Sequence, residues 1–512
     1  MNNTEILKLY NYLAPFSEKI KATKLILASM IMLIACVSFS SADESTEKHE
    51  LVTSDFNLIK DGFGAHNYGV AWADYNRRNY ENSDFVDNHI NFINKIKGTS
   101  TIITQNLTYV IDENVFRQNL AEIQYSNGAW GYQTFTAEDL NYLSHALENN
   151  QNSLIYYTSL MGDNGIRPDY TILGLLDVLN ADNFFAAYKE VMLQHATIAE
   201  KVGADLFIIG QELAIQFNRE NNLSWGYEEK WNDILSSMRK IYSGKITYGA
   251  HFGIVHPDPN RNSNEALKLS FGNGLDAIGI DMYGVEPINQ YGELTFETLT
   301  IDELIGLWAQ FPNSDVSPVK ELRKIYDLWN LPIVVTETAR MSGRYKDGWE
   351  YDEKYLDLQG QANKYYADLF VLNVYLGDIN ISYPALPYQH EYLLSARDDF
   401  SANVNNKPSE DVIKYFFSGD FYKDNLEIRI LPQFEFATGY HGHDNFFVDG
   451  FSDIKVYGGQ GNDRIFFSSS KNNYKITSDA DINGGTVTDS SGNILTFHDV
   501  EMLVFTDDNI IF

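Results

Sequence analysis

The sequence is poor in cysteine and in basic residues, and each shortage excludes a class of protein. Cys36 is the only cysteine in 512 residues, so the chain forms no internal disulfide. Lys and Arg number 38 against 70 Asp and Glu, which leaves a net charge of −32. Such a field repels phosphate backbones and anionic lipid surfaces, and we therefore expect no nucleic-acid partner.

The amino-terminal apolar run is too short to be a comfortable membrane span. Residues 25–35 are largely apolar, and Lys19, Lys21 and Lys24 precede them. A basic stretch followed by a short apolar core is typical of an export signal, which we place at residues 1–42.

Two processing sites compete within this signal. Residues 33–36 (LIAC) resemble a bacterial lipobox, which predicts lipidation of Cys36, whereas residues 40–42 (SSA) fit cleavage between small residues. The mature protein would then be either lipid-anchored at the cell surface of a bacterium or secreted. Residues 43–60 are polar and would form a linker.

Between residues 61 and 420, short apolar runs alternate with amphipathic stretches. The stretches at 184–202, 231–242 and 318–329 have apolar residues at helical spacing. The chain lacks a glycine-rich phosphate loop, which argues against an open doubly wound sheet. We therefore predict an α/β fold, a (β/α)8 TIM barrel, with strands at residues 68–72, 99–104, 153–159, 205–210, 246–251, 277–281, 333–337 and 379–383.

The composition changes near residue 421 to Asp, Gly, Asn, Phe and Ser. Residues 439–446 (GYHGHDNF) and 458–465 (GGQGNDRI) both match the nonapeptide G-G-x-G-x-D-x-U-x. Asp453 lies between Asp444 and Asp463, as in a degenerate middle repeat. Residues 421–512 are thus predicted to form a small all-β domain, a parallel β-roll, in which these three aspartates bind structural Ca²⁺.

Two glutamates lie where buried strands of the predicted barrel end. The run 204–212 closes on Glu212 and the run 331–337 closes on Glu337. The carboxyl ends of parallel strands carry the active site in α/β barrels. Two carboxylates at one mouth are what glycosidic bond cleavage requires, at roughly 5–5.5 Å separation for retention. Glu212 and Glu337 are our candidate catalytic pair.

Other side chains near these strand ends are candidate substrate-binding groups. His251 and Tyr283 follow the next two strands, and each could orient a carboxylate or a sugar hydroxyl. Gln211 and Asp281 adjoin these positions, and Trp72 could stack on the apolar face of a sugar ring. No metal or other cofactor is expected for catalysis itself.

The central part of the chain resembles glycoside hydrolase family 113, from about residue 180 to 370. The resemblance is carried by residues 186–188 (AAY), 195–205 (HATIAEKVGAD), 209–213 (IGQEL), 231–248, 275–283 (LDAIGIDMY) and 332–338 (PIVVTET). It implies a retaining, endo-acting (β/α)8 hydrolase of the β-mannanase type, with Glu212 as the acid/base and Glu337 as the nucleophile. The carboxyl-terminal segment resembles RTX (hemolysin-type) calcium-binding repeats.

The chain departs from this family at three substrate-facing places. Gln211 precedes the acid/base where the family commonly has Thr, and residues 161–168 and 383–388 lack the tryptophans expected there. The expected partner is a polysaccharide or oligosaccharide, and we expect a monomer. The alternatives are a catalytically inactive, surface glycan-binding barrel protein, and a polysaccharide lyase or transglycosylase.

Overall fold

The computed structural model describes residues 91, 94–98, 100–110, 122–125, 153–162, 181–213, 227–252, 264–282, 298–312, 315–338, 340, 343–345, 351–383, 404, 406–479 and 483–512. Our predictions for the export signal, the linker, Cys36, Trp72 and Tyr283 lie outside these residues. None of the helices in the described ranges combines the length and the apolar character that a membrane crossing needs.

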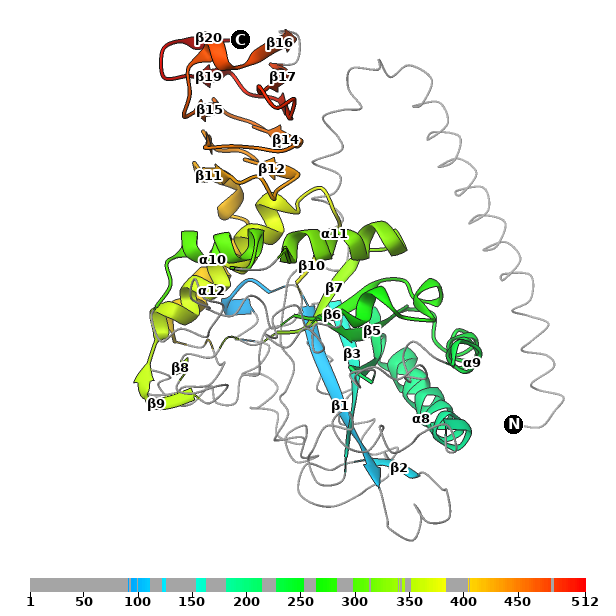
Figure 1. Cartoon of the computed structure of the whole chain (residues 1–512). Coiled ribbons are helices and arrows are strands. Elements are labelled where there is room, and N and C mark those ends of the chain that lie inside the picture. The colour runs from blue at the N-terminus through cyan, green and yellow to red at the C-terminus, as the bar shows by residue number, and fades with distance from the viewer. Residues whose placement is uncertain are drawn as a thin grey trace, which may run out of the picture. The chain divides into compact units, whose positions relative to one another are not determined.

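The first part of the described chain is built on one curled sheet of parallel strands (Figure 1). Its order is β10-β7-β6-β5-β4-β3-β1-β2, and within the described residues only β2 runs antiparallel to its neighbour. The strands are β1 (Ser100–Val110), β2 (Glu122–Tyr125), β3 (Ser153–Gly162), β4 (Leu206–Gln211), β5 (Lys245–His251), β6 (Ile278–Asp281), β7 (Ile333–Glu337) and β10 (Ile381–Ser382). A hairpin of β8 (Gly343–Tyr345) and β9 (Tyr351–Leu356) follows β7.

Helices lie between most of the parallel strands, since parallel neighbours need a long crossover connection. They are α8 (Ala181–Val202), α9 (Glu228–Met238), α10 (Ile301–Ala309), α11 (Pro318–Trp329), α12 (Leu358–Phe370) and α13 (Pro408–Phe417). Short helical turns are η1 (Glu265–Leu267), η2 (Gly272–Gly274), the π-helical turn η3 (Val371–Tyr375), η5 (Phe421–Lys423) and η6 (Lys471–Asn473). The α/β fold class with a (β/α)8-type sheet is confirmed.

The segment from α11 to β7 illustrates why these residues form these elements. The Ser317 side chain accepts a hydrogen bond from the Lys320 backbone N–H, and Pro318 occupies the first helical position. Asn330 ends the helix in the left-handed conformation. β7 then follows with four buried residues in succession, as in a strand covered on both faces.

Residues 427–512 form two further five-stranded sheets, the β-roll (orange to red in Figure 1). In one sheet, β11, β13, β15 and β19 are parallel, and β20 closes it antiparallel. In the other, β12, β14 and β18 are parallel, and β17 and β16 close it. The strands are β11 (Glu427–Ile430), β12 (Phe436–Thr438), β13 (Asn445–Val448), β14 (Ile454–Tyr457), β15 (Arg464–Phe467), β16 (Lys475–Asp479), β17 (Gly484–Thr488), β18 (Ile494–His498), β19 (Met502–Val504) and β20 (Asn509–Ile511).

The roll's core comes from alternate residues of these short strands. Phe446 and Ile465 stack in register between the sheets, each fully buried, whereas Asn445 and Arg464 beside them face outward. Each coil therefore buries one apolar face against its neighbours. The predicted parallel β-roll fold is confirmed.

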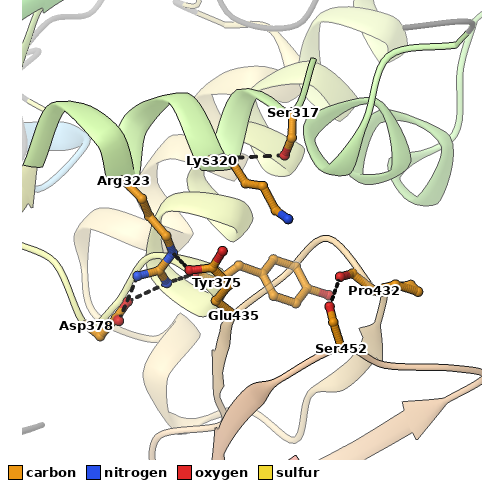
Figure 2. A network of polar contacts seen from close by, with 8 residues as sticks. All are labelled: Ser317, Lys320, Arg323, Tyr375, Asp378, Pro432, Glu435 and Ser452. Carbon is orange, nitrogen blue, oxygen red and sulfur yellow. Dashed lines mark hydrogen bonds and ion pairs between the residues drawn. The ribbon is translucent and has the colours of Figure 1, made fainter. Parts of the chain in front are cut away.

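The roll contacts the α/β domain through η3 and α11. Tyr375 stacks on Phe434 with ring centroids 3.8 Å apart, and its hydroxyl donates to the Arg429 carbonyl at 2.7 Å. Figure 2 shows the polar contacts beside this ring, where Arg323 of α11 donates twice to Asp378 at 2.8 Å and once to the Tyr375 carbonyl.

This junction lies at the end of the sheet where β7 and β10 begin. The Ile333 N–H, which opens β7, donates to the carbonyl of Asn380, which directly precedes β10. The candidate catalytic glutamates lie at the opposite, carboxyl ends of the strands. The described contacts of the roll with the α/β domain therefore lie on the amino-end side of the sheet, away from the candidate catalytic glutamates.

Candidate active site

Glu212 directly follows β4, and its side chain is only 4% exposed. Its backbone lies in the left-handed region with φ of 43°, and its N–H donates to the Gly249 carbonyl of β5 at 2.8 Å. A register shift between Ile208 and Gln211 precedes it. Left-handed backbone is unusual for a residue with a Cβ, so the surrounding bonds must hold it in place.

Glu337 is the last residue of β7 and is partly exposed. It pairs in register with Asp281 of β6, and its carbonyl accepts from the Met282 N–H at 2.7 Å. Asp281 in turn pairs with His251 of β5. The ends of β4, β5, β6 and β7 therefore bring both glutamates to one edge of the sheet, as predicted from the sequence.

His251 contacts the buried carboxylate of Glu212. Its Nδ1 lies 2.8 Å from the Glu212 Oε1, and its own side chain is 25% exposed. An imidazole nitrogen can donate to an ionised carboxylate or accept from a protonated one. This contact can therefore persist while the carboxyl group gains and loses a proton.

Asp281 is the last residue of β6, between the ends of β5 and β7. It is fully buried, and its Oδ1 accepts from the Thr336 hydroxyl at 2.7 Å. A Cβ on Gly249 would lie 2.9 Å from the same oxygen, so glycine is needed there to leave space for this carboxylate. Gln211, at the end of β4, is 6% exposed. Substrate contacts of Asp281 and Gln211 stay predictions.

Three further charged residues in this part of the fold, Arg340, Asp368 and Glu265, are buried and were not among the residues predicted from the sequence. Arg340, three residues after Glu337, is 1% exposed and donates through Nε to Asp368 of α12 at 2.7 Å. Trp308 of α10 donates to the same carboxylate. Glu265, in η1, is 1% exposed and accepts from His251 and Tyr248. A single charged residue has no periodicity or motif that predicts its burial. The only signal in the sequence is that Arg340 lies three residues after the end of a predicted strand.

The aspartates of the glycine-rich repeats occupy two different edges of the roll. Asp444 precedes β13 and Asp463 precedes β15 in one sheet, whereas Asp453 precedes β14 in the other. The Asp444 N–H donates to the Asp463 Oδ1 at 2.7 Å, but Asp453 accepts from the Ile494 N–H. Our expectation that all three meet is corrected, because nine residues make half a coil and alternate motifs face opposite edges.

Asp444 and Asp463 are buried, whereas Asp453 is exposed. Both are 0% exposed, and in each the Oδ2 has no hydrogen-bond partner. Burial raises the pKa of Asp444 to about 7 and that of Asp463 to about 7. Among the residues that the structure describes, no three His, Cys, Asp or Glu side chains converge as a metal-binding group. Any cation on this edge must therefore take backbone oxygens or water as well.

Residues 177–370 match the family model of glycoside hydrolase family 113. This segment contains both candidate glutamates and the strands β4 to β7 that carry them. The α/β region is a glycoside hydrolase domain. No curated protein matches the chain in sequence.

Several solved structures are similar to the chain. A GH113 β-mannanase from Alicyclobacillus acidocaldarius is 14% identical over 70% of this chain and 99% of its own, with a TM-score of 0.49. A second GH113 β-1,4-mannanase is 17% identical over 69% and 98%, also with a TM-score of 0.49. A psychrophilic family 10 endo-β-1,4-xylanase is 14% identical over 70% and 98%, with a TM-score of 0.39.

Proposed function

We propose that the glycoside hydrolase domain is a retaining, endo-acting β-glycosidase that cleaves a β-linked polysaccharide in the manner of a β-mannanase. The observation that carries this is the placement of Glu212 and Glu337 at one edge of the sheet, inside the segment that the family model matches. Two carboxyl groups in different environments can divide the acid and nucleophile roles.

In the proposed first step, the Glu337 carboxylate attacks the anomeric carbon and forms a glycosyl ester. The Glu212 carboxyl group gives its proton to the departing glycosidic oxygen as that bond breaks. In the second step, Glu212 takes a proton from water, the water oxygen bonds to the anomeric carbon, and the ester to Glu337 breaks. Two inversions leave the product with its original configuration.

The surroundings of the two carboxyl groups support this division of roles. Glu212 is buried and lies against His251 Nδ1, which suits a group that must hold and return a proton. Glu337 is the more exposed of the two, at the end of β7, which lies between β10 and β6. In this proposal Gln211, Tyr283 and Trp72 bind sugar, and Asp281 supports the strand that carries Glu337.

The decisive experiment is hydrolysis of a panel of β-mannans, glucomannans, β-glucans and xylans by the wild type, Glu337→Gln and Glu212→Gln. Glu228→Gln, an exposed substitution in the first turn of α9, is the matched control. Product anomers are followed by NMR. We expect retained configuration on at least one substrate, and loss of at least about 10³-fold in kcat with Glu337→Gln but not with the control.

The panel also separates the alternatives. Glycan binding that persists in both glutamine variants, with no turnover by any form, would indicate a glycan-binding barrel protein. Unsaturated products would indicate a lyase, and elongated products a transglycosylase. Inverted configuration would contradict the double displacement.

We further propose that the Asp444–Asp463 edge of the roll binds Ca²⁺ with a structural role. Two buried, unpartnered carboxylate oxygens on adjacent coils suit a hard cation that takes six to eight oxygen ligands. A Cβ on Gly439 would lie 2.2 Å from the Asp444 Oδ2. Only glycine at this position leaves room for the carboxylate oxygen. Bound Ca²⁺ would supply the positive charge that keeps both carboxylates ionised.

The calcium proposal is tested by hydrogen exchange with and without a chelator. All seven tryptophans precede residue 350, so tryptophan fluorescence reports on the chain outside the roll. We expect chelation to speed amide exchange in residues 427–512, and Asp444→Asn or Asp463→Asn to remove this calcium response. Asp453→Asn, on the other edge, should retain it. Equal exchange in both conditions would contradict calcium binding.

We also propose that residues 1–42 direct export, with the mature chain secreted or lipid-anchored. The mass of the mature protein from a bacterial host decides between cleavage after Ala42 and lipidation at Cys36. Cys36→Ser should release the protein from membranes if it is anchored. An intact amino terminus would contradict export by this route.

A further inference from the structure

A buried carboxylate that the proposed reaction does not use contacts two residues that support the candidate acid/base. Glu265 opens η1 and is 1% exposed. Its Oε1 accepts from the Tyr248 hydroxyl at 2.7 Å, and its Oε2 accepts from the His251 backbone N–H at 2.7 Å. Burying a carboxylate costs free energy unless hydrogen-bond donors compensate it. Loss of either bond would therefore be costly, and the two donors are held in place.

The first bond leads to the residue that follows Glu212. The Leu213 N–H donates to the Tyr248 hydroxyl oxygen at 2.6 Å. Burial, together with the charge of Glu265, raises the pKa of Tyr248 well above its usual value, so the hydroxyl keeps its proton. The direction of the chain is therefore fixed: Leu213 donates to Tyr248, and Tyr248 donates to Glu265.

The second bond leads to the side chain that touches Glu212. Glu265 holds the backbone of His251, and the His251 ring lies 2.8 Å from the Glu212 Oε1. One buried carboxylate thus fixes both the peptide after Glu212 and the residue that contacts its carboxyl group. The left-handed backbone of Glu212, with φ of 43°, explains why such support is needed.

We propose that Glu265 is a positioning residue that sets the carboxyl group of Glu212 for proton transfer, acting through Tyr248 and His251. The inference rests on the proposed function, because it assigns Glu265 a role in the acid/base step. Glu265 does not itself touch the sugar. A general acid works only within hydrogen-bond reach of the leaving oxygen, so small displacements of Glu212 weaken that step selectively.

The test uses the dependence of rate on the leaving group. Glu265→Gln keeps the shape of the side chain but presents an amide N–H₂ to one of two donors, so one bond is lost. Tyr248→Phe removes the acceptor of the Leu213 N–H. Each variant is assayed on an unactivated β-linked oligosaccharide and on a 2,4-dinitrophenyl β-glycoside of the same sugar, whose leaving group needs little protonation.

We expect both variants to lower kcat/KM on the oligosaccharide by about 10- to 100-fold and to change it less than about threefold on the activated glycoside. Tyr242→Phe is the matched control. It removes a buried tyrosine hydroxyl that donates to the Ala204 carbonyl, ahead of the opposite end of β4. Its effect on the two substrates should be equal.

An equal loss on both substrates by Glu265→Gln, or no loss, would overturn the proposal and leave Glu265 a structural residue. If the wild type and all variants are inactive on the panel, the proposed function fails separately. The positioning role is then decided by NMR of ¹⁵N-histidine, assigned by His251→Gln. A His251 ring signal that shifts in Glu265→Gln supports the role, and an unchanged signal overturns it.

Discussion

The glycoside hydrolase domain and the β-roll satisfy their buried polar groups in different ways. In the first, the partners are far apart in sequence: Trp308 and Arg340 both reach Asp368, across 60 and 28 residues. In the roll, Asp444 bonds to Leu426 on one neighbouring coil and Asp463 on the other, across 18 and 19 residues. The roll is a repeat stabilised by neighbouring coils, whereas the glycoside hydrolase domain depends on contacts that no repeat supplies.

The largest expected effect contrasts a buried ion pair with an exposed one. Arg340→Met leaves the Asp368 carboxylate buried at 2% exposure without its cation, and should cost about 3–5 kcal/mol of stability. Arg429→Met breaks the pair with Asp449 on the roll, where both side chains are more than half exposed. That variant should cost less than about 1 kcal/mol.

Urea unfolding followed by tryptophan fluorescence measures the first variant, and hydrogen exchange of residues 427–449 measures the second. Equal costs in the two regions would contradict the contrast.

The second prediction concerns two glycines of the roll with similar backbone. Gly459 has φ of 95°, and a Cβ there would lie 2.0 Å from the Tyr440 carbonyl of the previous coil. Gly492 has φ of 90° with open space around it. Gly492→Ala should cost about 1–2 kcal/mol through backbone strain alone, and Gly459→Ala clearly more, because neighbouring coils must separate.

Hydrogen exchange across residues 427–504 gives the comparison. Tryptophan fluorescence should report an unchanged glycoside hydrolase domain in both glycine variants. If Gly492→Ala is the more damaging of the two, coil stacking does not limit the roll's stability.

The third prediction tests the junction between the two regions. Tyr375→Phe keeps the ring on Phe434 but removes the hydroxyl that donates to the Arg429 carbonyl. The expected cost is about 1 kcal/mol, because one hydrogen bond is lost without a cavity. Faster exchange confined to β11 and η3 would confirm that the bond couples the regions, and unchanged exchange there would contradict it.

The smallest effect at neutral pH concerns His195 of α8. This ring is fully buried, its Nδ1 lies 2.7 Å from the Tyr156 hydroxyl, and burial lowers its pKa to about 3. Between about pH 3 and pH 6.5 the imidazole of His195 is therefore protonated in the unfolded chain and neutral in the folded chain. The free energy of unfolding therefore has its full value above about pH 6.5 and falls toward pH 3, by about 1.4 kcal/mol per pH unit.

Unfolding midpoints between pH 7 and 5, followed by tryptophan fluorescence, should fall in the wild type and fall less steeply in His195→Gln. Identical slopes would show that His195 is not the group that titrates.

Much of the fold could be predicted from local signals. The predicted helix 318–329 and the predicted strand 333–337 coincide with α11 and β7, because a serine cap, a proline and an apolar run mark their limits. The short strand β2 and the π-helical turn η3 were not anticipated. Their sequences carry no distinctive period, and pairing or packing decides their form.

The sequence by itself determined the alternation of strands and helices, the glycine-rich repeat and the two glutamates at strand ends, because periodicity and strand termination are local properties. Only the tertiary structure decided that His251 touches Glu212, that Glu265 supports both, and that Asp453 lies apart from Asp444 and Asp463. These relations depend on which strands become neighbours and which edge each turn faces. Both are set by the packing of residues distant in sequence.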